Sequence, residues 1–392
     1  LVRTDDRFRK VFVWHGRRLH PLPDGFQLLA PTAMRPFVTS SLFSLPGKLR
    51  MALDLVLPRG VSSMSRGSGD DESLGAFVRR RLGAEALERV AQPLVAGIYT
   101  ADPDDLSLAA TMPRFLEVEK RDRSIILGLR RALKRAPLPG TSGARWSLFV
   151  TFGHGMEEMI TTLAGRLPAG AVVLKQRVSA LERAGDRWRV KTAEGGGFDA
   201  DRVILSGEAH ASARLVRYLD PALANLLSEI PYSSAATVSL GYRRADVPHP
   251  LDGFGFVVPR VEGKALLAGT FSSVKYPQRA PEGHVLIRGF LGGMLNTAIL
   301  DEDDASLIGR ARAELREALG ITAEPVLTRL HRWPASMPQY RVGHLARVDT
   351  IERAMAALPG LALAGGAYRG VGIADCVRSG EAAAEQAFAT TA

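Results

Sequence analysis

The residues whose types and spacing most clearly suggest a binding site lie near the end of the chain. Four glycines fall there within eight residues: Gly365, Gly366, Gly370 and Gly372. An apolar run over 361–364 precedes them and predicts a buried strand, and residues 374–388 predict a helix. The first N–H groups of a helix have no internal partner and carry partial positive charge. The pattern therefore predicts a site for an electron-rich heterocycle or a phosphate, or else a tight crossover in which the glycines serve packing.

The composition argues against disulfides, metal sites and membrane-spanning helices. The chain has 392 residues, a net charge of +10 and one cysteine, Cys376, so no internal disulfide can form and no cysteine metal site is expected. The histidines are scattered without a metal-binding spacing, and no apolar run reaches the roughly 18 residues of a membrane-spanning helix. The positive charge would favour an acidic substrate, an anionic membrane surface or nucleic acid, although an arginine-rich proteome explains much of the excess.

The elements that must position the glycine turn begin with strands. Residues 10–14 and 17–20 predict a hairpin, and 33–139 predict mostly helices. In that region Ser73 can cap a helix that Gly83 ends. The basic segment 120–135 favours a solvated face over contact with a membrane or an acidic substrate.

Two further expectations concern the helical region. The segment 92–105 has the pattern of a loop leading to a helix near Leu106, with Asp104 and Asp105 at the start of that helix. Residues 60–71 are rich in Gly and Ser and predict a polar loop.

The rest of the chain predicts strands with few helices. Short strands are expected at 172–174, 177–182, 188–192 and 203–205, followed by strands at 237–242, 255–258, 265–271 and 284–290. Helices are expected at 221–230 and 303–319. A strand over 326–333 should end in a turn, 331–340, that exposes Trp333. In the last helix Val377 and Ala384 are expected on one side, with Arg378, Glu381 and Glu385 in solvent.

Four segments together resemble one family. They are Gln92-Pro-Leu-Val-Ala-Gly-Ile-Tyr-Thr-Ala-Asp-Pro-Asp-Asp-Leu-Ser-Leu, Phe152-Gly-His-Gly-Met-Glu-Glu, Arg332-Trp-Pro-Ala-Ser-Met-Pro-Gln-Tyr340 and 363–380. The resemblance is to the oxygen-dependent protoporphyrinogen/coproporphyrinogen III oxidase family of haem biosynthesis, in the FAD-dependent amine-oxidase-like superfamily. It covers essentially the whole chain, and the four segments together are more specific than any glycine pattern alone.

The resemblance implies an α/β fold of three interleaved parts. These are a substrate-binding mixed sheet from 1–32 and 231–345, a helical lobe over 33–145, and a discontinuous FAD-binding, Rossmann-like domain from 146–230 and 346–392. The strand–GxGxxG–helix unit with which such FAD domains begin is not found in the sequence. We therefore expect that about seventy residues of the family pattern precede this sequence and that the FAD domain lacks its first βαβ unit.

The resemblance also implies the residues that meet the cofactor. Backbone N–H groups near a helix start can hydrogen-bond the flavin edge where negative charge develops on reduction. The implied cofactor-binding residues are Val178, Trp333, Gly366, Val371, Gly372 and Ile373. On the residues alone, a position in an ordinary core strand is favoured for Val178, and a packed position in a turn is favoured for Trp333. No acid–base pair stands out, so the catalytic residues stay unknown.

The activity implied is FAD-dependent oxidation of a porphyrinogen, coproporphyrinogen III or protoporphyrinogen IX, by dioxygen. Six electrons leave the substrate and hydrogen peroxide is released. The alternatives are another flavin oxidoreductase of this superfamily with an amine or carotenoid substrate, and a non-catalytic porphyrin-binding fragment. We expect no metal and no nucleic acid, and a cytoplasmic location. Peripheral contact with the inner face of the membrane and a homodimer are left open.

Overall fold

A seven-stranded sheet is the largest β element of the computed structural model, which describes residues 1–27, 29–60, 71–135 and 149–388. Its order is β15-β11-β14-β13-β12-β2-β3. The β12 and β2 strands pair in parallel and the other neighbours antiparallel, so the predicted α/β fold with a mixed sheet is confirmed. The strands are β2 (Val11–His15), β3 (Arg18–Pro21), β11 (Tyr232–Arg243), β12 (Gly255–Val257), β13 (Leu266–Phe271), β14 (His284–Gly292) and β15 (Leu327–Pro338).

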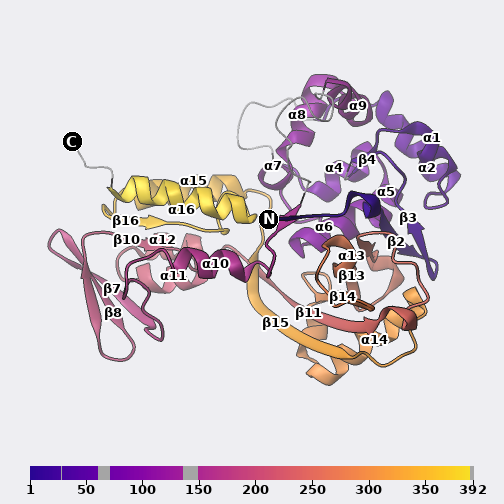
Figure 1. Ribbon diagram of the computed structural model, residues 1–392. Coiled ribbons are helices and arrows are strands. Elements are labelled where there is room, and N and C mark those ends of the chain that lie inside the picture. Colours follow the sequence, from indigo (N-terminus) through magenta and orange to yellow (C-terminus); the bar gives the residue numbers. More distant parts are fainter. Residues whose placement is uncertain (28, 61–70, 136–148, 389–392) are drawn as a thin grey trace.

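One face of this sheet is covered by α14 (Asp304–Leu319) (Figure 1). The helix begins where the Asp303 side chain accepts a hydrogen bond from the Ser306 N–H, and it ends at Gly320 in the left-handed conformation. Its buried residues recur at helical spacing and share one core with buried residues of β11 and β14: Leu307, Ala311, Leu315, Leu319, Val238, Leu240, Val285 and Ile287. Side chains of β11, β14 and β15 that point away from α14 therefore face the opposite side of the sheet.

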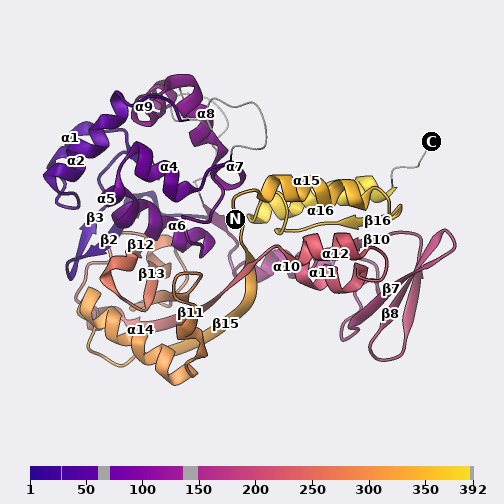
Figure 2. The same cartoon turned by 180° about the vertical axis from the view of Figure 1, so that it is seen from behind.

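A helical lobe packs on that opposite side over the β12 and β13 strands (Figure 2). Its core includes Val257 and Ala268 of the sheet together with Phe77, Val95 and Phe115 of the helices. Its helices are α1 (Met34–Thr39), α2 (Leu45–Ala52), α4 (Leu74–Arg81), α5 (Ala84–Ala86), η3 (Leu87–Ala91), α6 (Gln92–Tyr99), α7 (Leu108–Thr111), α8 (Pro113–Asp122) and α9 (Ile125–Arg135).

The remaining part of the chain lies beside the sheet and the lobe, joined to them by the long strands β11 and β15 (Figure 2). In it β10 and β16 pair in parallel, and β7, β8 and β9 form a separate antiparallel sheet. Its elements are α10 (Glu157–Ala164), β7 (Val178–Ala184), β8 (Arg187–Thr192), β9 (Gly197–Ala200), β10 (Val203–Leu205), α11 (Ala209–Val216), α12 (Pro221–Ser228), α15 (His344–Met355), β16 (Leu361–Leu363) and α16 (Ile373–Phe388).

The smaller elements complete the chain. Two short antiparallel pairs join β1 to β6 and β4 to β5, and α13 packs on β14. They are β1 (Val2–Arg3), η1 (Asp6–Phe8), β4 (Phe26–Gln27), β5 (Ala30–Pro31), η2 (Leu53–Leu55), β6 (Val150–Thr151), η4 (Arg244–Asp246), η5 (Arg260–Glu262), α13 (Ser272–Lys275) and η6 (Thr297–Asp301).

The local signals at helix ends behave as predicted. The Ser73 side chain accepts a hydrogen bond from the Ala76 N–H and caps α4, and Gly83 follows that helix with φ 95°. The hairpin is confirmed as β2 and β3. Of the polar loop predicted over 60–71, residues 61–70 lie outside the part of the chain that the structure describes.

The prediction of a loop over 92–105 is wrong at its start. Residues Gln92–Tyr99 form α6, which continues without a break from η3. Pro93, which has no backbone N–H to donate, directly follows the wider π-helical turn of η3, and Thr100 ends the helix in the left-handed conformation. Ser107 caps α7, whereas Asp104 instead binds Arg79 through two contacts of 2.6 Å.

Other strand predictions also need correction. Residues 172–174 do not form a strand, and the sequence did not reveal β9 or α11. The turn predicted over 331–340 is absent because β15 runs on to Pro338, pairing with β11 across a register shift between Ser233 and Ala235. Trp333 lies within this strand with half of its surface exposed.

Candidate functional site

The glycine turn connects β16 to α16 and takes a conformation that side chains would obstruct. Gly365 has φ 112° and Gly370 has φ 152°. A Cβ atom on Gly370 would lie 2.5 Å from the Asp375 Cγ, and one on Gly372 would lie 2.9 Å from an Asp375 carboxylate oxygen. The Gly372 N–H in turn donates to that carboxylate over 3.3 Å. Glycine is therefore required where the turn folds back against the first turn of α16.

Tyr340 ties the two ends of the turn together. Its hydroxyl donates to the Gly366 carbonyl oxygen over 2.8 Å and accepts from the Gly370 N–H over 2.8 Å. Burial is the main reason that the pKa of Tyr340 lies above its usual range, so the hydroxyl keeps the proton that it donates. Sequence reasoning did not single out this residue, although it lies only seven positions after Trp333.

His344 supports Tyr340 from the first turn of α15. The two rings are stacked with centroids 3.9 Å apart, and His344 Nε2 donates to the Tyr368 carbonyl oxygen over 2.8 Å. The carbonyl can only accept, which fixes the proton on Nε2. Burial lowers the pKa of His344 to about 4, so the ring is neutral at physiological pH. Both rings thus brace the segment that leads into α16.

The start of α16 presents backbone and apolar side chains to solvent. Gly372 and Ile373 are exposed, whereas Val371 packs partly against the core of the helical lobe. The prediction that Val377 faces the core is wrong, because Val377 is 49% exposed and Ala383 and Ala387 are the buried residues of this helix. An apolar surface therefore runs along α16 from Ile373 to Val377, beside N–H groups that have no partner within the helix.

The six predicted cofactor residues occupy three places in the structure. Gly366, Val371, Gly372 and Ile373 come together in one turn. Trp333 lies on β15, where its Nε1 donates to Thr237 Oγ1 over 3.3 Å, and Val178 begins β7 in the three-stranded sheet. In the described part of the chain no hydrogen bond or ring contact joins Trp333 or Val178 to the turn.

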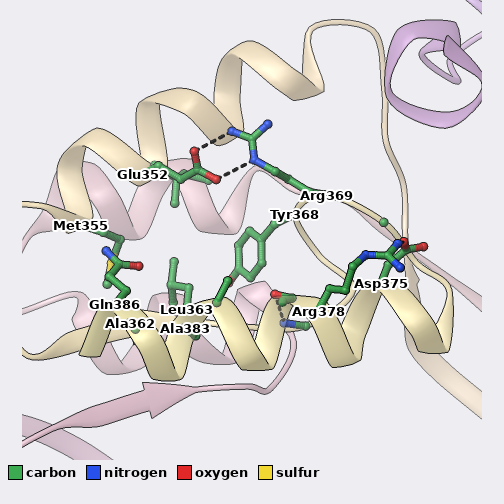
Figure 3. A pocket seen from close by; sticks show the side chains of 15 residues that line it. Glu352, Met355, Ala362, Leu363, Tyr368, Arg369, Asp375, Arg378, Ala383 and Gln386 are labelled. Carbon is green, nitrogen blue, oxygen red and sulfur yellow. Dashed lines mark hydrogen bonds and ion pairs between the residues drawn. The ribbon is translucent and has the colours of Figure 1, made fainter. Parts of the chain in front are cut away.

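A cavity of about 460 Å³ opens between α15 and α16 above β16 (Figure 3). Arg369 reaches across from the turn to Glu352 on α15 with contacts of 2.6 and 2.7 Å, and Arg378 pairs with Asp375 on α16. Apolar side chains form much of the remaining lining: Ile351, Met355, Ala362, Leu363, Ala382 and Ala383. The cavity touches Gly365 and Gly370, but the four turn residues predicted to meet a cofactor do not line it.

The sequence of this chain is similar to those of proteins with known activities. The family model for flavin containing amine oxidoreductases matches residues 1–387. The chain belongs to this family. A coproporphyrinogen III oxidase of Bacillus subtilis (strain 168) is 35% identical over 378 residues, which cover 96% of this chain and 79% of the relative. The chloroplastic protoporphyrinogen oxidase 1 of Arabidopsis thaliana is 30% identical over 401 residues, covering 96% of this chain and 71% of the relative.

The fold of the family is equally clear in a solved structure. A crystal structure of an Exiguobacterium sp. 255-15 protein assigned as a protoporphyrinogen oxidase superimposes with a TM-score of 0.83 at 30% identity. The match covers 97% of this chain and 80% of that protein. The predicted resemblance to the porphyrinogen oxidases and the predicted flavin cofactor are therefore confirmed at the level of the family.

Proposed function

We propose that this chain oxidises a porphyrinogen to the corresponding porphyrin, with FAD as cofactor and dioxygen as the final electron acceptor. The observation that carries the proposal is the 35% identity to a coproporphyrinogen III oxidase over 96% of the chain, a span that includes the glycine turn, Tyr340 and both long strands. Coproporphyrinogen III is the first candidate substrate, because the identity to that oxidase exceeds the 30% identity to the chloroplastic protoporphyrinogen oxidase.

The turn residues fit a flavin. Gly372 and Ile373 are exposed at the start of α16, where the positive end of the helix dipole favours negative charge on a ring edge. The apolar side chains of Val371 and Ile373 suit the face of an aromatic ring. FAD, when bound, supplies the electron-accepting chemistry of the reaction. The role of this chain is then to place Gly366, Val371, Gly372 and Ile373 along the ring and to hold the turn rigid through Tyr340.

Trp333 and Val178 complete the proposed cofactor contacts from other elements. Trp333 is half exposed on β15, and Val178 is 37% exposed at the start of β7. Neither side chain is therefore buried in the core. We assign the adenine end of FAD to the Val178 backbone and the approach to the flavin to Trp333. The three-part division into mixed sheet, helical lobe and FAD domain belongs to the same proposal.

Peripheral membrane contact is proposed for α2 and the turn after it. Leu45, Leu49 and Leu53 recur every four residues and are 75%, 71% and 48% exposed, and Val56 is 66% exposed. An apolar stripe of this kind on a basic protein fits the interface of an anionic bilayer. Among the described helices none is long and apolar enough to cross a membrane. The homodimer and the cytoplasmic location stay predictions.

The proposed activity is tested with the chain purified and supplied with FAD. Coproporphyrinogen III, protoporphyrinogen IX and a panel of primary amines are offered separately, and porphyrin fluorescence or peroxide release is followed. Porphyrinogens oxidise slowly in air, so FAD without protein is the control. Porphyrin formation above that control supports the proposal, and the ratio of the two rates identifies the substrate. Peroxide from amines with no porphyrin formation would overturn it.

A further inference from the structure

Arginines on the two sides of the seven-stranded sheet differ in whether they form ion pairs with carboxylates. On the side of α14, Arg310 binds Glu302 over 2.7 Å and Arg332 binds Asp304 over 2.8 Å. On the opposite side, Arg288 and Arg329 form no ion pair with any carboxylate in the part of the chain that the structure describes. Both residues are exposed. The open face of the sheet therefore carries positive charge that no carboxylate of the described residues pairs with.

These two arginines lie in one row across the sheet. Arg288 on β14 and Arg329 on β15 are both register partners of Ser239 on β11. Two strand spacings place their backbones roughly 10 Å apart. Ile287 is buried in the core under α14 and Leu330 packs partly against it, so the alternating Arg288 and Arg329 point away from that core.

The Arg288 guanidinium keeps most of its donors available. Its Nε donates to Ser239 Oγ over 3.2 Å. The pKa of Arg288 is lowered, first because the surrounding protein displaces water and then because Arg279 lies nearby. Arg279 in turn donates to the carbonyl oxygens of Phe152 and Gly153 over 2.7 and 3.0 Å, not to a carboxylate. An anion placed against this row would relieve an unfavourable concentration of positive charge.

The same face carries Trp333. Its Nε1 donates to Thr237, which stands between Ser239 and Ala235 on β11, and Ala235 is the register partner of Trp333. Four residues along β11 separate the row of Trp333 from the row of Arg288, or about 13 Å of strand. A macrocycle with its side chains, roughly 13 Å long, could thus contact Trp333 at one end and the arginine row at the other.

We propose that Arg288 and Arg329 bind the carboxylate groups of the porphyrinogen and so set its orientation against Trp333. This inference rests on the proposed function, in which the substrate is a macrocycle bearing two or four carboxylates. Arginine presents paired N–H donors that match a carboxylate, and such charge-assisted bonds are short and strong. The macrocycle then lies on the open strands β11 and β15, with its polar edge away from the flavin.

The test is equilibrium binding of coproporphyrin III and of its tetramethyl ester in the same detergent, followed by quenching of protein fluorescence. Arg288→Gln and Arg329→Gln remove charge, and Arg288→Lys retains it. Arg310→Gln, on the opposite face, is the control. We expect each Gln variant to weaken binding of the acid about tenfold to a hundredfold, with a partial recovery in Arg288→Lys. Binding of the ester and the behaviour of Arg310→Gln should match the unmodified chain.

Two results would overturn the proposal. Binding of the acid unchanged in both Gln variants would show that other groups receive the carboxylates. Equal weakening for acid and ester would show that the arginines only maintain the fold. Loss of the proposed function is a separate outcome: the unmodified chain would then form no porphyrin, while the titrations with acid and ester still decide whether the two arginines recognise carboxylates.

Discussion

The hydroxyl of Tyr340 donates a hydrogen bond to the Gly366 carbonyl oxygen over 2.8 Å, and so anchors the entry to the glycine turn. The same hydroxyl accepts from the Gly370 N–H at the exit of the turn. One side chain from the segment after β15 thus fixes both ends of the loop that leads into α16. The hydrogen bonds of Tyr340 thus connect the end of the seven-stranded sheet to the turn of the proposed flavin site.

Tyr340→Phe should loosen the turn without removing the ring that stacks on His344. Loss of both hydrogen bonds is expected to lower the free energy of unfolding by about 1–3 kcal/mol, measured by urea denaturation, and to weaken FAD binding. Tyr232→Phe is the matched control, since its hydroxyl accepts one hydrogen bond from the Ala209 N–H outside the turn. If both variants bind FAD as tightly as the unmodified chain, Tyr340 does not position the site.

Gly370→Ala should be harmful for a steric reason. The added Cβ would lie 2.5 Å from Asp375 Cγ, and the backbone φ of 152° is unfavourable for a side chain. We expect a loss of about 1–3 kcal/mol in the free energy of unfolding and a displaced helix start.

Gly380→Ala supplies the comparison within the same helix. A Cβ at Gly380 meets nothing within 4 Å, and alanine is the better helix former. This variant should gain about 0.5–1 kcal/mol and retain FAD binding. Equal loss of stability in the Gly370 and Gly380 variants would contradict the geometry of the turn.

The sequence predicted the glycine turn, but it did not predict Tyr340 and His344, the side chains that hold the turn in place. Four glycines after an apolar run identify a strand–turn–helix from local pattern alone, and Ser73, Gly83 and Asp303 mark helix ends because capping is a local interaction. Tyr340 and His344 could not be assigned, because their roles depend on contacts with Gly366, Gly370 and Tyr368, which lie 24–30 residues away.

The wrong predictions for 92–99, the end of β15 and Val377 share one cause: each depended on contacts with parts of the fold that are distant in the sequence. The segment 92–99 contains Pro93 and Gly97, two residue types that disfavour a helix, yet Pro93 directly follows the π-helical turn of η3 and Gly97 lies near Val257. Pro334 made the end of β15 look like a turn, although pairing with β11 continues through a register shift. Val377 was assigned to the core because local hydrophobicity does not say which side of α16 meets the rest of the fold.

Acidification should destabilise the protein through His344. Its folded pKa of about 4 lies below the ordinary value of 6.5, so the unfolded chain binds a proton more readily and stability is lost as the pH falls from 6.5 towards 4. This residue alone accounts for a loss of up to about 3 kcal/mol. Denaturation midpoints across this interval should depend less on pH in His344→Gln. An unchanged pH dependence in that variant would exclude His344 as the cause.

Vesicle binding tests the apolar stripe on α2. We expect the chain to sediment with vesicles of phosphatidylcholine and phosphatidylglycerol and the double variant Leu45→Gln/Leu49→Gln to lose most of this binding, because each change removes exposed apolar surface from the bilayer interface. Val261→Gln is the control, since Val261 is 60% exposed outside the stripe. Binding that is equally strong in the double variant would mean that α2 does not contact the membrane.

The most direct test of the proposed function is the ratio of hydrogen peroxide released to porphyrin formed by the FAD-loaded chain in air. Removal of six electrons in two-electron steps predicts three molecules of peroxide for each porphyrin, at a rate that rises with protein concentration and exceeds the control with FAD alone. A rate no higher than that control, with FAD shown to be bound, would contradict porphyrinogen oxidation as the activity of this chain.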